Sequence, residues 1–272
     1  MTDSQKKPSE VSPQWALLPR ASMRYVRTGQ RGRPVLLLHE MGGSLESWNP
    51  VIDLMPPDQQ VLRCDMRGAG GSEKIRAETS CEELADDIVA LLDHLGITEP
   101  IDVAGCAIGG CLALTLAARH PGRVHRLAPI NPPTDAEGRS GEVLRERAIL
   151  TDTRGMRGVV ESALARSYPD FLRAHKEVYE SYVARFLTND PTSYAFILRA
   201  LVRVDFKGVL ETINCPTLFI AGQHDLVRTP KATAAVAPRV RGARFLEIEG
   251  GHIPSVQAPA ALAAALAEFF GW

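Results

Sequence analysis

The most useful absences in this sequence concern membranes and charge. Its 272 residues contain no run of 18 apolar residues, so we expect no membrane-spanning helix. The formal net charge is −1, which gives the chain no overall field that would attract nucleic acid or an anionic membrane. Residues 1–13 are polar and lack the apolar core of a signal peptide. We therefore expect a cytoplasmic protein with no nucleic-acid partner and no membrane partner.

Cysteine is scarce, and the patterns that usually hold cofactors are missing. The five cysteines are scattered and odd in number, with no C-x-x-C pair and no histidine cluster. This excludes a zinc motif and argues against a disulfide framework. No dinucleotide fingerprint and no phosphate loop occur either. We expect no cofactor and no metal. The cysteines are Cys64, Cys81, Cys106, Cys111 and Cys215.

What is present is an alternation of strand-like and helix-like segments, in an ordinary globular composition with 45% hydrophobic residues. Residues 35–38 form a continuous apolar run, typical of a strand buried on both faces. The alternation predicts an α/β fold with a mostly parallel sheet and helices on both faces. The predicted strands are 35–38, 61–64, 101–104, 126–130, 217–221 and 244–248, and the predicted helices are 80–95, 108–119 and 259–270.

The alternation stops between residues 134 and 205. This block has no convincing strand, and its periodicity predicts only helices. We therefore predict an α/β core of residues 1–133 and 206–272 and a helical cap of residues 134–205. A cleft between the cap and the ends of the strands is the usual place for a small ligand. The predicted cap helices are 145–150, 158–168, 171–187 and 193–204.

The segment from Ile101 to Gly110 has the layout of a strand, a tight glycine-rich turn and the start of a helix. That layout is typical of the motif G-x-S-x-G, in which the turn exposes a nucleophilic serine. Here the motif reads Gly-Cys-Ala-Ile-Gly, with Ala107 at the central position. Alanine has no atom that can attack a substrate. Ala107 is therefore either a substitution of a serine or a natural departure from the motif.

Four further loops surround this turn in the order used by one known family, and with them the chain resembles the α/β-hydrolases. The resemblance implies an eight-stranded, mostly parallel sheet with helices on both faces and an inserted helical cap. The cap length and residues 204–206 look most like 3-oxoadipate enol-lactonases. They also resemble aminoacrylate hydrolases, a group in which an alanine also occurs at this turn. The matching loops are 38–44 (LHEMGGS), 65–72 (DMRGAGGS), 222–225 (GQHD, with Pro230 beyond it) and 250–254 (GGHIP).

His252 is the residue that we expect to carry the chemistry. Two glycines precede it and Pro254 follows nearby, which predicts a tight exposed loop after a strand. Imidazole titrates near neutral pH, so it can act first as a base and then as an acid. The family pattern implies that Asp225 orients this imidazole. His224 and Asn131 compete for that role, but the amide of Asn131 cannot supply a charge.

The backbone N–H groups of Met41 and Ile108 are the expected donors of an oxyanion hole. Backbone donors need no particular side chain, so the hole can survive the loss of a serine. Glu40 stands beside this hole in place of the family's usual glycine. An inward carboxylate there would oppose a developing negative charge. We favour an outward Glu40 that faces solvent or a partner, and an inward acid or base is the alternative.

Several other reactive side chains are expected to serve the structure. Cys106 lies beside the turn and would be a competent nucleophile as a thiolate, but the position before the turn normally packs inward. Asp65, Arg67 and His39 are expected to tie loops together. One or two cap arginines could bind a substrate carboxylate in bidentate fashion. The candidates are Arg145, Arg147, Arg154, Arg157 and Arg166.

Three kinds of function fit these residues. The favoured one is hydrolysis of a small carboxylated ester, lactone or related acyl substrate, with His252 and Asp225 assisting the reaction without a serine. The second is a cofactor-free lyase or isomerase, in which His252 or Glu40 moves a proton. The third is a non-catalytic protein that binds a small molecule on a hydrolase scaffold. We expect a small-molecule substrate, for which a carboxylate is one candidate. We expect the protein to be a monomer or a homodimer.

Overall fold

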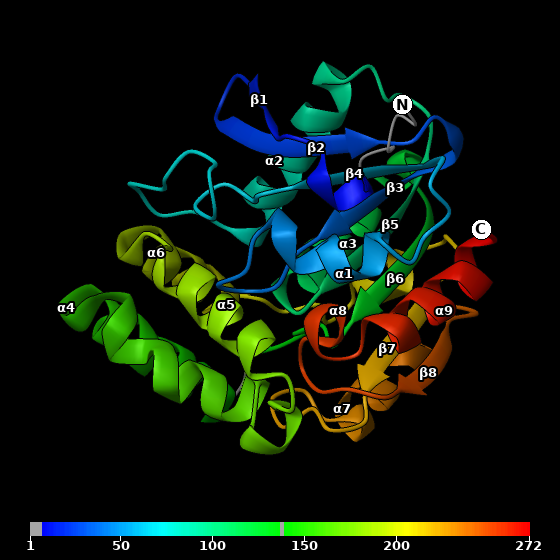
Figure 1. Cartoon of the computed structure of the whole chain (residues 1–272). Coiled ribbons are helices and arrows are strands. Elements are labelled where there is room, and N and C mark those ends of the chain that lie inside the picture. Colours follow the sequence, from blue (N-terminus) through cyan, green and yellow to red (C-terminus); the bar gives the residue numbers. More distant parts are fainter. Residues whose placement is uncertain (1–6, 137–138) are drawn as a thin grey trace.

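The fold is built around an eight-stranded sheet, shown in Figure 1. The computed structural model describes residues 7–136 and 139–272. β2 pairs antiparallel with β1 and β4, and the remaining neighbours are parallel, which confirms the predicted sheet type. In the order β1-β2-β4-β3-β5-β6-β7-β8 across the sheet, the strands are β1 (Gln14–Leu17), β2 (Ser22–Thr28), β4 (Gln59–Cys64), β3 (Arg31–Leu38), β5 (Ile101–Cys106), β6 (Val124–Ile130), β7 (Leu218–Gly222) and β8 (Arg244–Ile248).

Both faces of the central strands are covered, so their side chains form two hydrophobic clusters. In β3, Leu36 and Leu38 pack into one cluster with α2 and α3, whereas Val35 and Leu37 pack into the other with α1 and α9. This follows from the alternation of side chains along a strand. The helices of the sheet region are α1 (Asn49–Ile52), α2 (Cys81–His94), α3 (Ile108–Arg119), α7 (Pro230–Val236), α8 (Pro254–Gln257) and α9 (Pro259–Phe270). Short 3₁₀ helices lie at Pro8–Glu10, Leu45–Trp48, Pro121–Arg123, Asp170–Leu172, Leu210–Thr212 and Ala237–Arg239.

Between β6 and β7 the chain forms α4 (Arg139–Ser167), α5 (Lys176–Leu187) and α6 (Pro191–Val202), which we call the cap helices. They gather on one side of the molecule, away from most of the sheet (Figure 1). Their packing is apolar and aromatic. One buried cluster contains Tyr168, which directly follows α4, and these residues of the cap helices: Ala148, Met156, Val159, Ala163, Leu164, Tyr182, Phe186, Tyr194, Ala195 and Leu198.

The cap helices differ in detail from the predicted segments. The predicted helices 145–150 and 158–168 are two arms of α4, which is kinked at Gly155, where φ is 64° and ψ is −170°. The predicted helix 171–187 starts later, because a 3₁₀ turn over residues 170–172 precedes α5. The segments that enter and leave this block lie side by side, since Asp135 and Asp205 form an antiparallel bridge. The predicted boundaries at residues 134 and 205 fall beside that bridge.

The sequence pattern did not predict β1 and β2. β1 is a short edge strand in which Trp15 and Leu17 are exposed, so it lacks the buried apolar run that marks the central strands. β2 has one covered face and an irregular burial pattern, which weakens its alternation. Within the described ranges, we find no helix with the length and apolar character needed to cross a membrane.

Candidate active site

The turn between β5 and α3 holds Ala107 in a strained backbone conformation. Its φ of 51° lies in the left-handed region that side chains rarely adopt. The turn is tight because α3 starts at the next residue and runs close to β3. A Cβ at Gly109 would lie 2.3 Å from the carbonyl oxygen of Leu38, so only glycine fits there. The backbone therefore presents residue 107 at the carboxyl end of the sheet, where Ala107 offers only a methyl group.

His252 and Asp225 come together from the loops that follow β8 and β7. Nδ1 of His252 lies 2.7 Å from Oδ2 of Asp225. The other oxygen of Asp225 accepts the N–H groups of Val227 at 2.6 Å and Arg228 at 2.9 Å, so its loop fixes the carboxylate. Asp225 is fully buried, whereas His252 keeps 12% of its side chain exposed. Within the described residues, Nε2 of His252 has no hydrogen-bond partner, and a carboxylate on Nδ1 favours the tautomer in which Nε2 can accept a proton.

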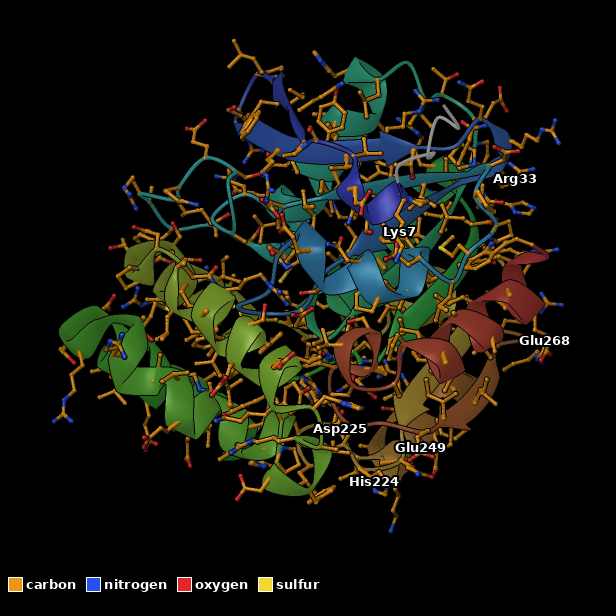
Figure 2. All side chains as sticks on the ribbon, viewed as in Figure 1. Lys7, Arg33, His224, Asp225, Glu249 and Glu268 are labelled. Carbon is orange, nitrogen blue, oxygen red and sulfur yellow. The ribbon has the colours of Figure 1, made fainter. Side chains whose placement is uncertain are left out.

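The two competitors for the orienting role lie elsewhere. The ring of His224 packs edge-on against Phe171, with centroids 5.7 Å apart. Figure 2 shows His224 nearer the outer edge of the molecule than Asp225. Asn131 donates from Nδ2 to the carbonyl oxygens of Gly251 and His252, each at 3.0 Å. The Asn131 amide therefore holds the backbone of the loop that carries His252, whereas the imidazole of His252 bonds to Asp225.

The N–H groups of Met41 and Ile108 are both available to a ligand. Ile108 is the first residue of α3, and a first helical residue has no acceptor within its own helix. In the described part of the chain, neither N–H donates to a backbone or side-chain acceptor. Both residues line the same cavity as Ala107 and His252. Two N–H groups on one cavity, without an acceptor among the described residues, are the kind of donors that an oxyanion hole would need.

We favoured an outward Glu40 that faces solvent or a partner, and the outward, solvent-facing orientation is wrong. Glu40 is 1% exposed and lines the cavity. The chain turns sharply after it, with the Gly43 N–H donating to the Glu40 carbonyl at 3.1 Å, and Ser47 then donates from Oγ to Oε1 of Glu40 at 2.8 Å. Gly43 makes room for this carboxylate, since a Cβ there would lie 2.1 Å from Oε1. The second oxygen, Oε2, is buried without a partner.

Three other polar residues connect loops, as expected. His39 is buried, and its Nε2 accepts the N–H of Met66 at 3.2 Å. Asp65 accepts the N–H of Leu45 at 2.8 Å. Arg67 donates from Nε to a carboxylate of α2 at 2.6 Å. These bonds hold the loop after β4 against the rest of the core and against the loop after β3, which carries Met41 and borders the cavity.

Cys106 is fully buried at the end of β5, beneath the turn, and this environment disfavours a nucleophilic role. Burial raises the pKa of its thiol well above the usual range, and the carboxylates of Glu40 and Asp225 add to this shift. Its Sγ lies 3.4 Å from the carbonyl oxygen of His252 and donates to it. The thiolate, which is the reactive form, is therefore disfavoured.

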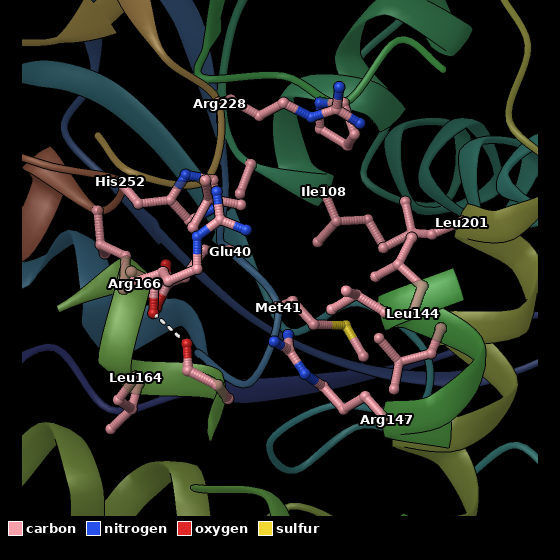
Figure 3. A pocket seen from close by; sticks show the side chains of 18 of the residues that line it. Glu40, Met41, Ile108, Leu144, Arg147, Leu164, Arg166, Leu201, Arg228 and His252 are labelled. Atoms are coloured by element: carbon pink, nitrogen blue, oxygen red, sulfur yellow. Dashed lines mark hydrogen bonds between the residues drawn. The ribbon is translucent and has the colours of Figure 1, made fainter. Parts of the chain in front are cut away.

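A cavity of about 350 Å³ lies between the core and the cap helices, and its lining includes Glu40, Met41, Ala107, Ile108 and His252. Most of its wall is apolar, but Arg147, Arg166 and Arg228 also line it. Figure 3 shows the three arginines on different parts of the wall. Three guanidinium groups around an apolar cavity favour an anionic ligand. The cap arginines that are exposed and do not line it are Arg145, Arg154 and Arg157.

Arg228 and Tyr182 are two of the cavity residues that the sequence did not predict. Arg228 lies three residues after Asp225 in the same loop, so the motif already placed it near the site. Tyr182 lies one helical turn before Phe186 on α5, and such spacing predicts a shared buried face. Neither residue could be assigned to the cavity without the packing of the cap helices. Among the described residues, no group of three or more His, Cys, Asp or Glu side chains could hold a metal ion.

Comparison with known proteins identifies the family. A family model described as alpha/beta hydrolase fold matches residues 33–259. The chain therefore belongs to the α/β-hydrolase family and is an enzyme of that superfamily. This confirms the resemblance that the loop motifs suggested.

Among similar proteins, "3-oxoadipate enol-lactonase 2" of Acinetobacter baylyi is 27% identical over 242 residues, covering 88% of this chain and 90% of that protein. "Putative carbamate hydrolase RutD" of Caulobacter sp. (strain K31) is 31% identical over 241 residues, covering 86% of this chain and 89% of the relative. The crystal structure of the enol-lactonase from Burkholderia xenovorans LB400 has a TM-score of 0.89 and 27% identity, covering 95% of this chain and 100% of that one. The similarity thus extends over nearly the whole fold.

Proposed function

We propose that this protein hydrolyses a small anionic acyl substrate by direct attack of water, without a covalent intermediate. The observation that carries the proposal is the pairing of His252 with Asp225 at 2.7 Å. The cavity that His252 lines also contains Ala107, the central residue of the turn between β5 and α3, which we call the elbow. The base, its orienting acid and two free N–H donors are all available at the elbow. Only the nucleophile of the usual serine mechanism is missing.

The reaction requires one base and two donors. Nε2 of His252 takes a proton from a water molecule as the water oxygen bonds to the acyl carbon. The N–H groups of Met41 and Ile108 stabilise the oxyanion that forms, each by roughly 3 kcal/mol. When the oxyanion collapses, the bond to the leaving oxygen or nitrogen breaks, and the imidazolium of His252 returns its proton to that atom. Asp225 stabilises the imidazolium between these steps.

The substrate class follows from the cavity wall and from the relatives. Arg147, Arg166 and Arg228 favour a substrate with a carboxylate, and the surrounding apolar residues favour a short hydrocarbon body. Similar proteins are named as an enol-lactonase and a carbamate hydrolase. We therefore propose a carboxylated lactone, ester or carbamate. Direct hydrolysis needs an acyl bond with a low intrinsic barrier, because covalent catalysis is lost.

A lyase or isomerase reaction is the second candidate, and the inward orientation of Glu40 favours it. A buried carboxylate in the same cavity as His252 gives the site a second group that could move a proton. The oxyanion hole would then hold an enolate. Such a reaction forms no bond to water.

Heavy-oxygen water distinguishes the two candidates. The protein is incubated in H₂¹⁸O with a panel of carboxylated lactones, esters and carbamates, and the products are analysed by mass spectrometry. We expect ¹⁸O in the new carboxylate or carbonate product and no acyl adduct on the intact protein. A product without ¹⁸O would exclude hydrolysis, and a stable acyl adduct would exclude direct attack by water.

The cellular compartment and the division of the chain into core and cap are also proposed here. We propose a cytoplasmic enzyme, because the five cysteines are free thiols and free thiols are typical of a reducing compartment. We also propose a core of residues 1–133 and 206–272 with a cap of residues 134–205.

A further inference from the structure

Within the described part of the chain, two buried polar atoms in the cavity wall form no hydrogen bond of ordinary geometry. They are Oε2 of Glu40 and the hydroxyl of Tyr182. Each residue is 1% exposed, and each lines the cavity that contains Ala107 and His252. Buried polar atoms are nearly always hydrogen-bonded, so two such atoms in one cavity require an explanation.

The two side chains face each other across the boundary between core and cap. Glu40 follows β3 in the core, whereas Tyr182 lies on α5 of the cap. The Tyr182 hydroxyl approaches the Glu40 carboxylate, and burial together with this carboxylate raises the pKa of Tyr182 well above the usual range. The two groups nevertheless do not meet hydrogen-bond geometry with each other. The pair thus combines an acceptor, Oε2 of Glu40, with a hydroxyl that can donate or accept.

The carboxylate of Glu46, in the same region, has hydrogen-bond donors on both of its oxygens. Glu46 accepts from Arg24 Nη2 at 2.5 Å through one oxygen and from Ser44 Oγ at 2.6 Å through the other. Among the described residues, the Ser47 hydroxyl is the only group that meets hydrogen-bond geometry with the Glu40 carboxylate, although Glu40 is more deeply buried than Glu46. No Arg, Lys or His of the described residues forms an ion pair with it within 4 Å. A half-satisfied buried carboxylate costs stability, so its retention points to a ligand.

We propose that Glu40 and Tyr182 form a subsite that binds an O–H or N–H group of the substrate. This subsite rests on the proposed function, because it makes the same cavity selective among anionic acyl compounds. Oε2 of Glu40 accepts the substrate's proton donor, and the Tyr182 hydroxyl completes the contact. The arginines of the cavity wall hold the substrate carboxylate. The substrate therefore carries both a carboxylate and a neutral hydroxyl or N–H group.

Such a subsite discriminates strongly between substrates that carry an O–H or N–H group at this position and analogues that lack it. A site built to bond a substrate hydroxyl or N–H rejects the analogue that lacks it, because the buried partners of the site are then left unpaired. Glu40 would in this way exclude simple carboxylated esters that the arginines alone would accept.

Stability measurements separate a ligand subsite from a structural contact. Glu40→Gln keeps the shape and the Ser47 bond but removes the buried charge, so we expect Tm to stay unchanged or rise by about 2–4 °C. The matched control is Glu46→Gln, which loses a paired charge and should lower Tm. A fall in Tm for Glu40→Gln as large as that of the control would show a structural role and overturn the proposal.

Binding measurements test the chemistry of the partner. Calorimetry compares matched acids with and without a hydroxyl, malate against succinate and 2-hydroxyglutarate against glutarate. We expect the hydroxylated acid to bind at least about tenfold more tightly in one pair, and the preference to fall to within about twofold in Glu40→Met. Equal affinities in both pairs, or a preference that survives Glu40→Met, would overturn the subsite. If no acid binds, the anionic cavity of the proposed function is contradicted, and the Tm comparison still decides the role of Glu40.

Discussion

Asp225→Asn is the substitution whose effect follows most directly from the geometry. In the folded protein, one Asp225 oxygen accepts two backbone N–H groups and the other faces Nδ1 of His252. An asparagine can keep the two backbone bonds through its carbonyl oxygen. Its NH₂ group then points at Nδ1 and donates, so the imidazole proton must move to Nε2. Nε2 is the atom that has to accept a proton, so the base is lost while the loop is preserved.

The magnitude follows from the loss of the correct tautomer. Comparable changes in Ser-His-Asp sites lower turnover by up to about 10⁴. Here we expect a loss of about 10² to 10⁴, equivalent to about 3–5 kcal/mol in the activation free energy. Stability should change little, because the two backbone bonds remain and His252 still meets a hydrogen-bonding group.

The assay can be made independent of the natural substrate. Ala107→Ser places a hydroxyl at the elbow, and a fluorophosphonate labels such a serine only when a base activates it. We expect Ala107→Ser to be labelled, and the labelling rate to fall by about 10² to 10⁴ in Ala107→Ser with Asp225→Asn. Ala107→Ser with His252→Ala is the control for complete loss of the base. Labelling rates within about threefold of each other, at equal Tm, would refute the assigned role of Asp225.

Three further predictions concern other parts of the structure. Burial opposes ionisation of Glu46, but hydrogen bonds from Arg24 and Ser44 lower its pKa to about 2. The stability that the ionised Glu46 adds to the fold is present above about pH 4.5 and is lost as the pH falls toward 2. Tm measured across that range should therefore fall less steeply in Glu46→Gln than in the wild type. Because burial raises the pKa of Cys106, iodoacetamide at pH 8 should leave Cys106 unmodified in the native protein, as peptide mass spectrometry would show; rapid modification would contradict its burial. Arg147→Gln should raise the KM of a carboxylated substrate about tenfold or more with kcat within about threefold, in steady-state kinetics; an unchanged KM would remove Arg147 from the anion site.

The parts of the fold that local sequence dictates could be predicted. The tight turn around Ala107 depends on neighbouring glycines, and the loop that ends in His252 begins with two more. Short motifs of this kind specify backbone geometry within a few residues. The chain order of these motifs then specified the family, and with it the pairing of His252 with Asp225.

The parts that depend on packing between distant segments could not be predicted. Glu40 points inward because Gly43 leaves room for it and Ser47 bonds to it, and neither effect is visible in the pattern of the loop. Tyr182 reaches the same place only through the docking of α5 onto the core. By contrast, Gly155 adopts a non-helical backbone with φ of 64° and ψ of −170°, which divides α4 into two helical arms, and this agrees with the two helices predicted from the sequence.

The central claim is that His252 activates water in a site without a nucleophile. Its most direct test is kcat/KM of His252→Ala relative to the wild-type protein, measured on a carboxylated lactone, ester or carbamate that the wild type hydrolyses. We expect a loss of about 10² or more, because general-base catalysis contributes that much, with Tm and ligand binding retained. A kcat/KM for His252→Ala equal to that of the wild type would contradict it.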